Sequence, residues 1–289
     1  MQRPAQQRWA TSQSVHQGKA GHHPCIPRCH LAPLKEKLTN GHHRRSHDYQ
    51  LSVSQRHRGN EMSRIYDFAS KVVRRIYEKR INAPAILDAA TEFPNSTKFI
   101  ADWQSIREEA FAVRLNRAPR FHDLMPEQTE ISASDGLDWR MFILKAYDVA
   151  VPENLARMPV LSRLLFECPE VKSAAISFLA PGKHIPIHRG PFRGIMRFHL
   201  GLDIPRQADG SPATVMVIND QEKRISDGEG MLWDDTFPHA VTNYANQARV
   251  ALLLDVWRPR MPLDMEILSR LIVRGVQAGM RYRGVSFAA

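Results

Sequence analysis

The most informative pattern in this sequence runs from Ser177 to Arg258. It begins SFLAPGKHIPIHRG (177–190) and continues through MRFHL (196–200), WDDTFPH (233–239) and RVALLLDV (249–256). Four of the five histidines outside the first 60 residues lie in it. Short apolar runs separated by Gly, Pro, Asp and Asn are typical of the strands of a β-sandwich or barrel. Imidazoles placed between such runs indicate metal ligands carried on strands.

The rest of the pattern adds helices before and after this β region. Besides five apolar runs at 174–179, 195–202, 213–218, 230–233 and 249–257, residues 139–147 alternate as a strand does. Apolar residues at helical spacing predict helices at 65–77, 98–115, 155–166 and 263–280, and residues 116–138 predict a long loop. The sequence therefore predicts a mainly β fold with flanking helices.

The positive charge is concentrated at the N-terminus. The formal net charge is +10, but residues 1–60 hold ten Lys/Arg against two acids, which leaves 30 Lys/Arg against 28 acids for the remainder. No nucleic-acid partner is therefore expected. Residues 1–60 are also rich in Gln, His, Ser, Gly and Pro. We predict a disordered basic tail at 1–60, an amphipathic helix and linker at 61–92, and one domain at 93–289.

Cysteine usage and hydropathy indicate the compartment. Only Cys25, Cys29 and Cys168 are present, which favours a reducing, cytoplasmic environment over a disulfide framework. Cys25 and Cys29 resemble half of a zinc site, but no second ligand pair with regular spacing accompanies them. No apolar run approaches the roughly 18 residues of a membrane span, and the N-terminus lacks the apolar core of a secretory signal.

The helix expected at 64–81 is strongly basic. Its apolar residues recur at helical spacing, and much of the other face holds Lys71, Arg74, Arg75, Lys79 and Arg80. One interpretation is a solvated helix that packs on the domain. The other is a peripheral contact with an anionic membrane surface.

The tripeptide His188-Arg189-Gly190 is the most unusual part of the histidine pattern. Non-haem iron oxygenases commonly hold the metal with two histidines and a carboxylate. The first histidine and the carboxylate often form an H-x-D/E tripeptide, because residues i and i+2 of a strand point to the same side. Here the third position is Gly190, which has no side chain. Either the site is inactive, or two histidines and a co-substrate suffice.

Residues 93–260, and above all 177–258, resemble the aspartyl/asparaginyl β-hydroxylase family of iron(II)- and 2-oxoglutarate-dependent dioxygenases. The resemblance implies a double-stranded β-helix (jelly-roll, cupin-like) fold and a reaction that uses Fe(II), 2-oxoglutarate and O₂. It implies His188 and His239 as iron ligands. It also implies co-substrate contacts at four residues: Ser177 and Arg249 at the distal carboxylate of 2-oxoglutarate, and Arg197 and His199 near its chelating end.

The residues themselves agree with these roles. Arg197 and His199 are two apart, so one strand would direct both inward. A buried guanidinium needs an anionic partner, which a carboxylate would supply in bidentate form. For Asp234 and Asp235, two interpretations stay open: acceptors that orient His239, or turn residues. A third interpretation, for Asp235 alone, is that it supplies the missing carboxylate ligand.

Other residues around the histidines receive peripheral roles. We expect His184 on a loop, as a surface or substrate-side residue, and Trp233 and Phe237 as wall or core. Three cations flank the ligand loop, and we expect them to be solvated at the mouth of the site, where together they would attract an acidic substrate: Lys183, Arg189 and Arg193.

The substrate is open between branches of the family. In the resembled family the aspartyl hydroxylase branch carries H-x-G, so Gly190 favours peptidyl Asp/Asn or a related small molecule. Residues 93–109 and Pro191-Phe192 look more like the lipid A hydroxylases, which implies an acyl-chain substrate as the alternative. Halogenation is a further reading of the missing carboxylate, and an inactive cupin-like binding module is the non-enzyme reading. The oligomeric state stays open.

Overall fold

The computed structural model describes residues 68–113, 118–125, 128–283 and 287. The predicted tail at 1–60, the Cys25–Cys29 pair and the beginning of the first expected helix lie outside the described residues. The described part of that helix covers residues 68–80. No described helix is long and apolar enough to cross a membrane.

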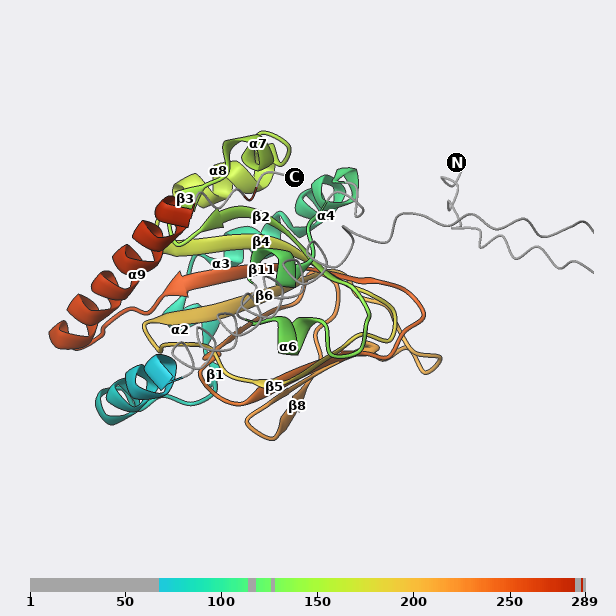
Figure 1. The fold of residues 1–289 in the computed structure, drawn as a ribbon. Helices are drawn as coiled ribbons and strands as arrows, with labels where there is room; N and C mark the ends of the chain where they lie inside the picture. The colour runs from blue at the N-terminus through green and yellow to red at the C-terminus, as the bar shows by residue number, and fades with distance from the viewer. Residues whose placement is uncertain (1–67, 114–117, 126–127, 284–286, 288–289) are drawn as a thin grey trace, which may run out of the picture. The chain divides into compact units, whose positions relative to one another are not determined.

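Two antiparallel sheets form the centre of the fold (Figure 1). The larger sheet has seven strands in the order β1 (Ile86–Leu87), β9 (Gly230–Trp233), β6 (Ile195–Asp203), β11 (Arg249–Trp257), β4 (Val171–Leu179), β2 (Trp139–Ala146) and β3 (Val149–Ala150). The smaller has four strands in the order β5 (His184–His188), β10 (His239–Asn243), β7 (Thr214–Ile218) and β8 (Gln221–Lys223). The predicted mainly β, jelly-roll fold with flanking helices is confirmed.

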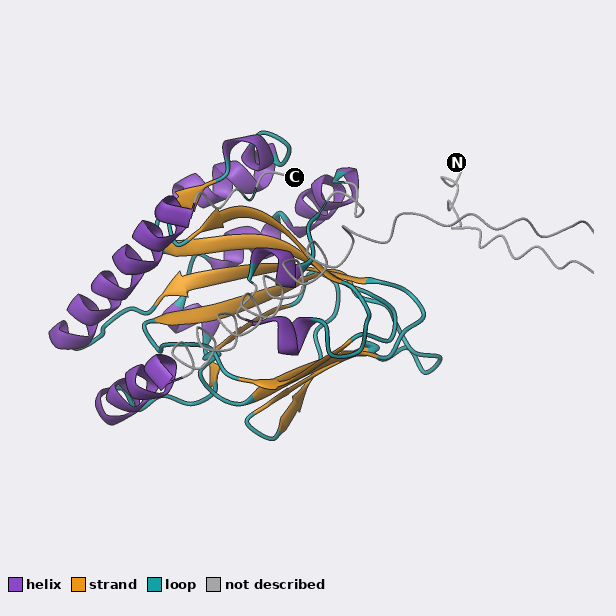
Figure 2. Cartoon of the chain, in the orientation of Figure 1, coloured by secondary structure: helices purple, strands orange, loops and turns teal. Residues whose placement is uncertain are grey.

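Helices cover one face of the larger sheet (Figure 2). They are α2 (Ala89–Glu92), α3 (Ser96–Ala101), α4 (Trp103–Ala112), α7 (Pro152–Leu155) and α8 (Pro159–Glu167). Phe198 and Leu252 of the central strands pack with Phe99, Ile106 and Leu161 in this main core. Strands β4, β6 and β11 are continuous apolar runs because both of their faces are covered, one of them by these helices.

The opposite face of the larger sheet meets the smaller sheet. A second core lies between them and joins Trp139, Leu179 and Trp233 to Met216 and Val241. Alternation along each strand separates the two cores: in β6, Phe198 faces the helices while Arg197 and His199 face the gap between the sheets. That gap holds the candidate site.

A third core lies at the end of the larger sheet where β11 finishes. The helix at residues 68–80 and α9 (Leu263–Arg283) pack there around Tyr77, Phe192 and Ile195. Figure 1 shows both helices on this side of the sheet. The Tyr77 hydroxyl is 2.6 Å from Ser269 Oγ, which ties the two helices together.

Three expectations about elements need correction. The helix expected at 98–115 is broken at Asp102 into α3 and α4. The expected loop at 116–138 contains α5 (Phe121–Leu124) and α6 (Thr129–Ser132). His184 begins strand β5, where a loop was expected. The expected strand at 139–147 and the helices at 155–166 and 263–280 are present with shifted ends.

Candidate functional site

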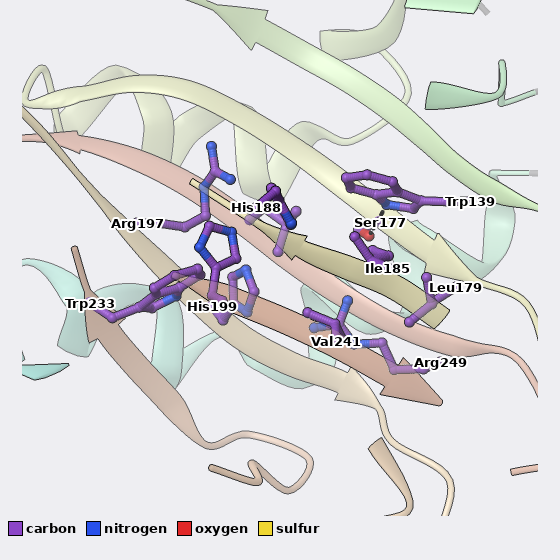
Figure 3. A pocket seen from close by; sticks show the side chains of 12 residues that line it. Trp139, Ser177, Leu179, Ile185, His188, Arg197, His199, Trp233, Val241 and Arg249 are labelled. Carbon is purple, nitrogen blue, oxygen red and sulfur yellow. Dashed lines mark hydrogen bonds between the residues drawn. The ribbon is translucent and has the colours of Figure 1, made fainter. Parts of the chain in front are cut away.

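A cavity opens between the two sheets, and Figure 3 shows its lining side chains. Strands from both sheets contribute: Trp139, Ser177, Leu179, Ile185, His188, Arg197, His199, Trp233, His239, Val241, Arg249 and Leu253. All six residues predicted as iron ligands or co-substrate contacts are among them. The fold therefore brings together residues that are up to 72 positions apart in the sequence.

His188 and His239 lie directly opposite each other on neighbouring strands. They are register partners in the β5–β10 pair, and their ring centroids are 4.0 Å apart. His188 Nδ1 lies 2.8 Å from the Pro186 carbonyl oxygen, and His239 Nδ1 lies 2.9 Å from the Phe237 carbonyl oxygen. A carbonyl only accepts, so each Nδ1 carries the proton and each Nε2 keeps its lone pair.

Burial keeps these imidazoles neutral. It lowers the pKa of His188 to about 4, partly opposed by the bond to the Pro186 carbonyl. Burial, followed by the neighbouring His188, lowers the pKa of His239 well below its usual value. Neutral imidazoles with free Nε2 atoms are the form that binds a metal ion.

No carboxylate completes a three-ligand centre in the described part of the chain. No group of three or more His, Cys, Asp or Glu side chains comes together there as a metal site. A Cβ added at Gly190 would overlap the side-chain carboxylate of Asp235. The Gly190 amide also donates to the Asp235 carbonyl oxygen at 2.6 Å. The glycine is thus required by close packing of the ligand loop against the β9–β10 turn.

Arg249 is the clearest anion-binding group in the cavity. It is 3% exposed, and its Nε and Nη2 have no hydrogen-bond partner among the described residues. Burial lowers its pKa to about 10, so it stays charged at neutral pH. Ser177, also in the lining, receives a hydrogen bond from Trp139 Nε1 at 3.1 Å, drawn in Figure 3. A buried, unpaired guanidinium is costly unless an anion completes it.

Arg197 differs from Arg249 because the protein already supplies its partners. Arg197 Nε donates to Asp255 at 2.9 Å, and Nη2 lies 3.4 Å from Asp235. Burial acts against the charged form of Arg197, but these two carboxylates outweigh it and raise its pKa. Burial raises the pKa of Asp235 to about 7, opposed by Arg197. The anionic partner expected for Arg197 is thus supplied by two carboxylates of the protein itself.

His199 lies on the same side of β6 as Arg197. Burial, followed by the charges of Arg249 and Arg197, lowers the pKa of His199 well below its usual value. Its Nδ1 lies 3.2 Å from Met216 Sδ, so this imidazole is a neutral, buried group in the cavity.

The cations expected at the mouth of the site are mostly buried. Lys183 is fully buried and binds Asp135 and the Ser132 carbonyl oxygen. Arg193 is buried and lies 2.9 Å from Asp234. Only Arg189 is substantially exposed. The three therefore do not form an exposed cationic patch, because Lys183 and Arg193 pair with carboxylates that lie far from them in the sequence.

Asp234 is a structural carboxylate rather than an acceptor for His239. Arg258 Nη2 donates to it at 2.7 Å, and the Thr236 hydroxyl donates at 2.6 Å. The backbone, through Phe237, takes the orienting role at His239. Asp234 instead fixes the turn that carries His239 to its strand.

Sequence reasoning missed part of the apolar lining. Trp139 stacks on Phe121 with ring centroids 3.9 Å apart and lines the cavity beside Ser177. Trp139 begins a strand in which apolar and polar residues partly alternate, and this alternation could have predicted an inward-facing side chain. Trp233, expected as wall or core, is buried in the wall, and its ring meets His239 edge-on at 4.5 Å. Its Nε1 has no partner among the described residues.

The donor set fits a divalent metal and a small dicarboxylate. Two neutral imidazoles with free Nε2 atoms provide two of the ligands that non-haem iron takes. The unpaired Arg249 beside the Ser177 hydroxyl fits a carboxylate. Aliphatic side chains between them suit the carbon chain of the same molecule: Leu179, Ile185, Val241 and Leu253.

Known proteins share this sequence region. An ester-linked acyl 2-hydroxylase of ornithine lipids from Rhizobium tropici is 30% identical over 182 residues, 62% of this chain and 63% of its own length. The human aspartyl/asparaginyl beta-hydroxylase is 28% identical over 165 residues, 55% of this chain and 20% of its own length. This chain therefore spans less than two thirds of either relative.

A structural likeness extends to the cupins. The cupin domain of an XRE-family transcriptional regulator from Enterobacter cloacae matches 30% of this chain and 82% of its own, with 18% identity and a TM-score of 0.25. The sequence profile of the aspartyl/asparaginyl beta-hydroxylases matches residues 100–259, which include every residue of the cavity. The chain belongs to the aspartyl/asparaginyl beta-hydroxylase family.

Proposed function

We propose that this protein is an iron(II)- and 2-oxoglutarate-dependent hydroxylase. The supporting observation is one cavity in which two neutral histidines, fixed in the same tautomer, lie with a buried guanidinium that has no partner among the described residues. Iron bound by His188 and His239 would supply O₂ activation and insertion of one oxygen atom into a C–H bond, coupled to oxidative decarboxylation of 2-oxoglutarate to succinate and CO₂.

The protein's own residues would bind and orient the reactants. Arg249 and Ser177 would hold the distal carboxylate of 2-oxoglutarate through charge-assisted hydrogen bonds. Trp139 and Trp233 would exclude water from the cavity. Arg197, held by Asp255 and Asp235, would present a fixed positive charge near the histidines.

For the substrate we propose an acyl chain of a membrane lipid. The rhizobial relative supports this choice, since its match is longer and more identical than that of the human relative. Gly190 loses its weight for peptidyl Asp/Asn, because Asp235 packs against it and accounts for the glycine. The human relative keeps peptidyl Asp/Asn as the second candidate.

Succinate formation tests the reaction. Purified protein with Fe(II), ascorbate, O₂ and 2-oxoglutarate is expected to produce succinate, and His188→Ala and His239→Ala are expected to produce none. An inactive binding module would give equally low succinate with wild type and variants. Lipid extracts and proteomes from cells expressing wild type or His188→Ala identify the substrate, since only its true class gains the mass of one oxygen atom.

A further inference from the structure

The helix at residues 68–80 and α9 form a hydrogen-bonded pair beside the ligand loop. Tyr77 contacts Ser269 of α9, and Arg80 Nε donates to Asp264 at 2.8 Å. Arg74 Nη1 donates to the Gly190 carbonyl oxygen at 3.1 Å. The helix pair is thus connected to the loop that follows His188. A partner bound to the outer surface of these helices would therefore lie close to the candidate metal centre.

Both helices expose a row of large apolar side chains. On the first, Phe68 is 69% exposed, and Val72 and Ile76 continue the row at a spacing of four. On α9, Leu263, Ile267 and Leu271 are 72%, 51% and 58% exposed at the same spacing. Single exposed apolar residues are ordinary on soluble proteins, but a row of them along each of two neighbouring helices indicates an interaction surface.

Unpaired basic residues accompany the apolar rows. Lys71, Arg75 and Lys79 of the first helix and Arg274 and Arg281 of α9 are exposed and form no ion pair among the described residues. The acids Glu78, Asp264 and Glu266 are each taken by an arginine. Apolar rows bordered by free cations suit the interface of an anionic bilayer. Two copies of the same surface would repel each other.

We propose that the outer faces of these two helices bind the surface of an anionic lipid bilayer. The link to catalysis rests on the proposed function: a lipid acyl chain would then be met by an enzyme already held at the membrane. The binding itself requires neither iron nor 2-oxoglutarate.

Co-sedimentation of the full chain with vesicles tests the proposal. We expect binding to vesicles of phosphatidylcholine with phosphatidylglycerol, and little binding to phosphatidylcholine alone. The double variant Ile267→Ser, Leu271→Ser is expected to weaken binding to these vesicles by about a hundredfold, since each of the two lost apolar side chains is expected to contribute a factor of about ten. Phe166→Ser is the matched control, because Phe166 is 90% exposed on α8. We expect it to bind as wild type does.

The double variant also distinguishes this surface from the basic N-terminal residues and from a dimer interface. Residues 1–60 would attract anionic vesicles in every variant, so wild-type binding by the double variant would overturn the proposal. A wild-type dimer that the double variant converts to a monomer in gel filtration would also overturn it, in favour of a second copy as the occupant. We expect His188→Ala to bind vesicles as wild type does, and the double variant to form succinate normally. These two results would separate membrane binding from the proposed reaction.

Discussion

Two backbone carbonyls decide which nitrogen of each candidate ligand is free. In both His188 and His239, Nδ1 donates to the carbonyl two residues earlier, so the strand that presents the ligand also fixes its tautomer. In many metal sites a carboxylate accepts a hydrogen bond from the ligating histidine and orients its ring. Here the backbone carbonyl oxygens of Pro186 and Phe237 have that role. The sequence predicted His188 and His239 as candidate ligands and left Asp234 and Asp235 open as orienting acceptors or turn residues. The orienting backbone carbonyls were missed, because side-chain acceptors are visible in a sequence and backbone acceptors are not.

Arg249 is expected to lower the stability of the fold while it provides affinity for 2-oxoglutarate. Arg249→Met removes a buried charge without a partner among the described residues, so we expect the free energy of unfolding to rise by about 1–3 kcal/mol. The same variant is expected to lose most affinity for 2-oxoglutarate, measured by ligand-induced protection in thermal denaturation. Arg197→Met is the control: Arg197 is paired with Asp255, and its loss is expected to destabilise the protein. A destabilised Arg249→Met protein would show that the buried guanidinium does not oppose folding.

Gly190 is expected to tolerate no side chain while Asp235 is present. In Gly190→Ala the added Cβ overlaps the Asp235 carboxylate, and we expect a loss of about 1–3 kcal/mol in unfolding free energy together with weaker metal binding. Thermal denaturation and titration with Ni²⁺ measure the two effects. In the double variant Gly190→Ala, Asp235→Gly the costs of the single changes are expected not to add. Strict additivity would show that the two residues do not compete for space.

At the scale of elements, the sequence predicted strands best where both faces are covered. β4, β6 and β11 read as continuous apolar runs because helices lie on one face and the second sheet on the other. The ligand strands β5 and β10 were not predicted as strands. Their sequences, HIPIH and HAVTN, are short and mix polar with apolar residues, since they form the wall of a polar cavity.

Long-range ion pairs account for the errors about the cations near the site. Lys183 and Arg193 were expected in solvent, but their carboxylate partners Asp135 and Asp234 lie 48 and 41 positions away. Local pattern carries no signal for such pairings. The six candidate site residues were predicted from the resemblance of their motifs to a known family, and the fold brings all six to one cavity. Burial of a charge, in contrast, depends on elements that meet only in the folded chain.

The β9–β10 turn is expected to depend on Asp234. Its fully buried carboxylate binds both Arg193 and Arg258, so Asp234→Asn leaves two buried cations short of their counter-charge. We expect a loss of about 3–5 kcal/mol in unfolding free energy by urea denaturation. Metal affinity should fall as well, since His239 begins the next strand. Glu108→Gln, an exposed change on α4, is the control with no expected effect. Similar stability of both variants would show that the cluster is not needed.

At the scale of the whole molecule, the cavity makes stability of the metal-free protein depend on pH. The folded chain keeps His188, His199 and His239 neutral, with the pKa of His188 near 4, while the unfolded chain protonates histidine near its usual 6.5. Between these values the unfolded state binds more protons, so unfolding free energy falls as pH falls, by up to about 1.4 kcal/mol per pH unit for each histidine.

Asp235 acts in the opposite direction. Its pKa near 7 means that the folded state takes up a proton which the unfolded state takes up only near 3.8, so it offsets one histidine in this window. A net difference of about two protons remains. Urea denaturation in EDTA at pH values of about 7.5, 6.5 and 5.5 is expected to show stability declining toward the acid side. In His188→Asn, the slope of unfolding free energy against pH is expected to fall by the equivalent of one bound proton. Stability that is constant over this range, or a slope unchanged in His188→Asn, would show that the cavity histidines are not held neutral by the fold.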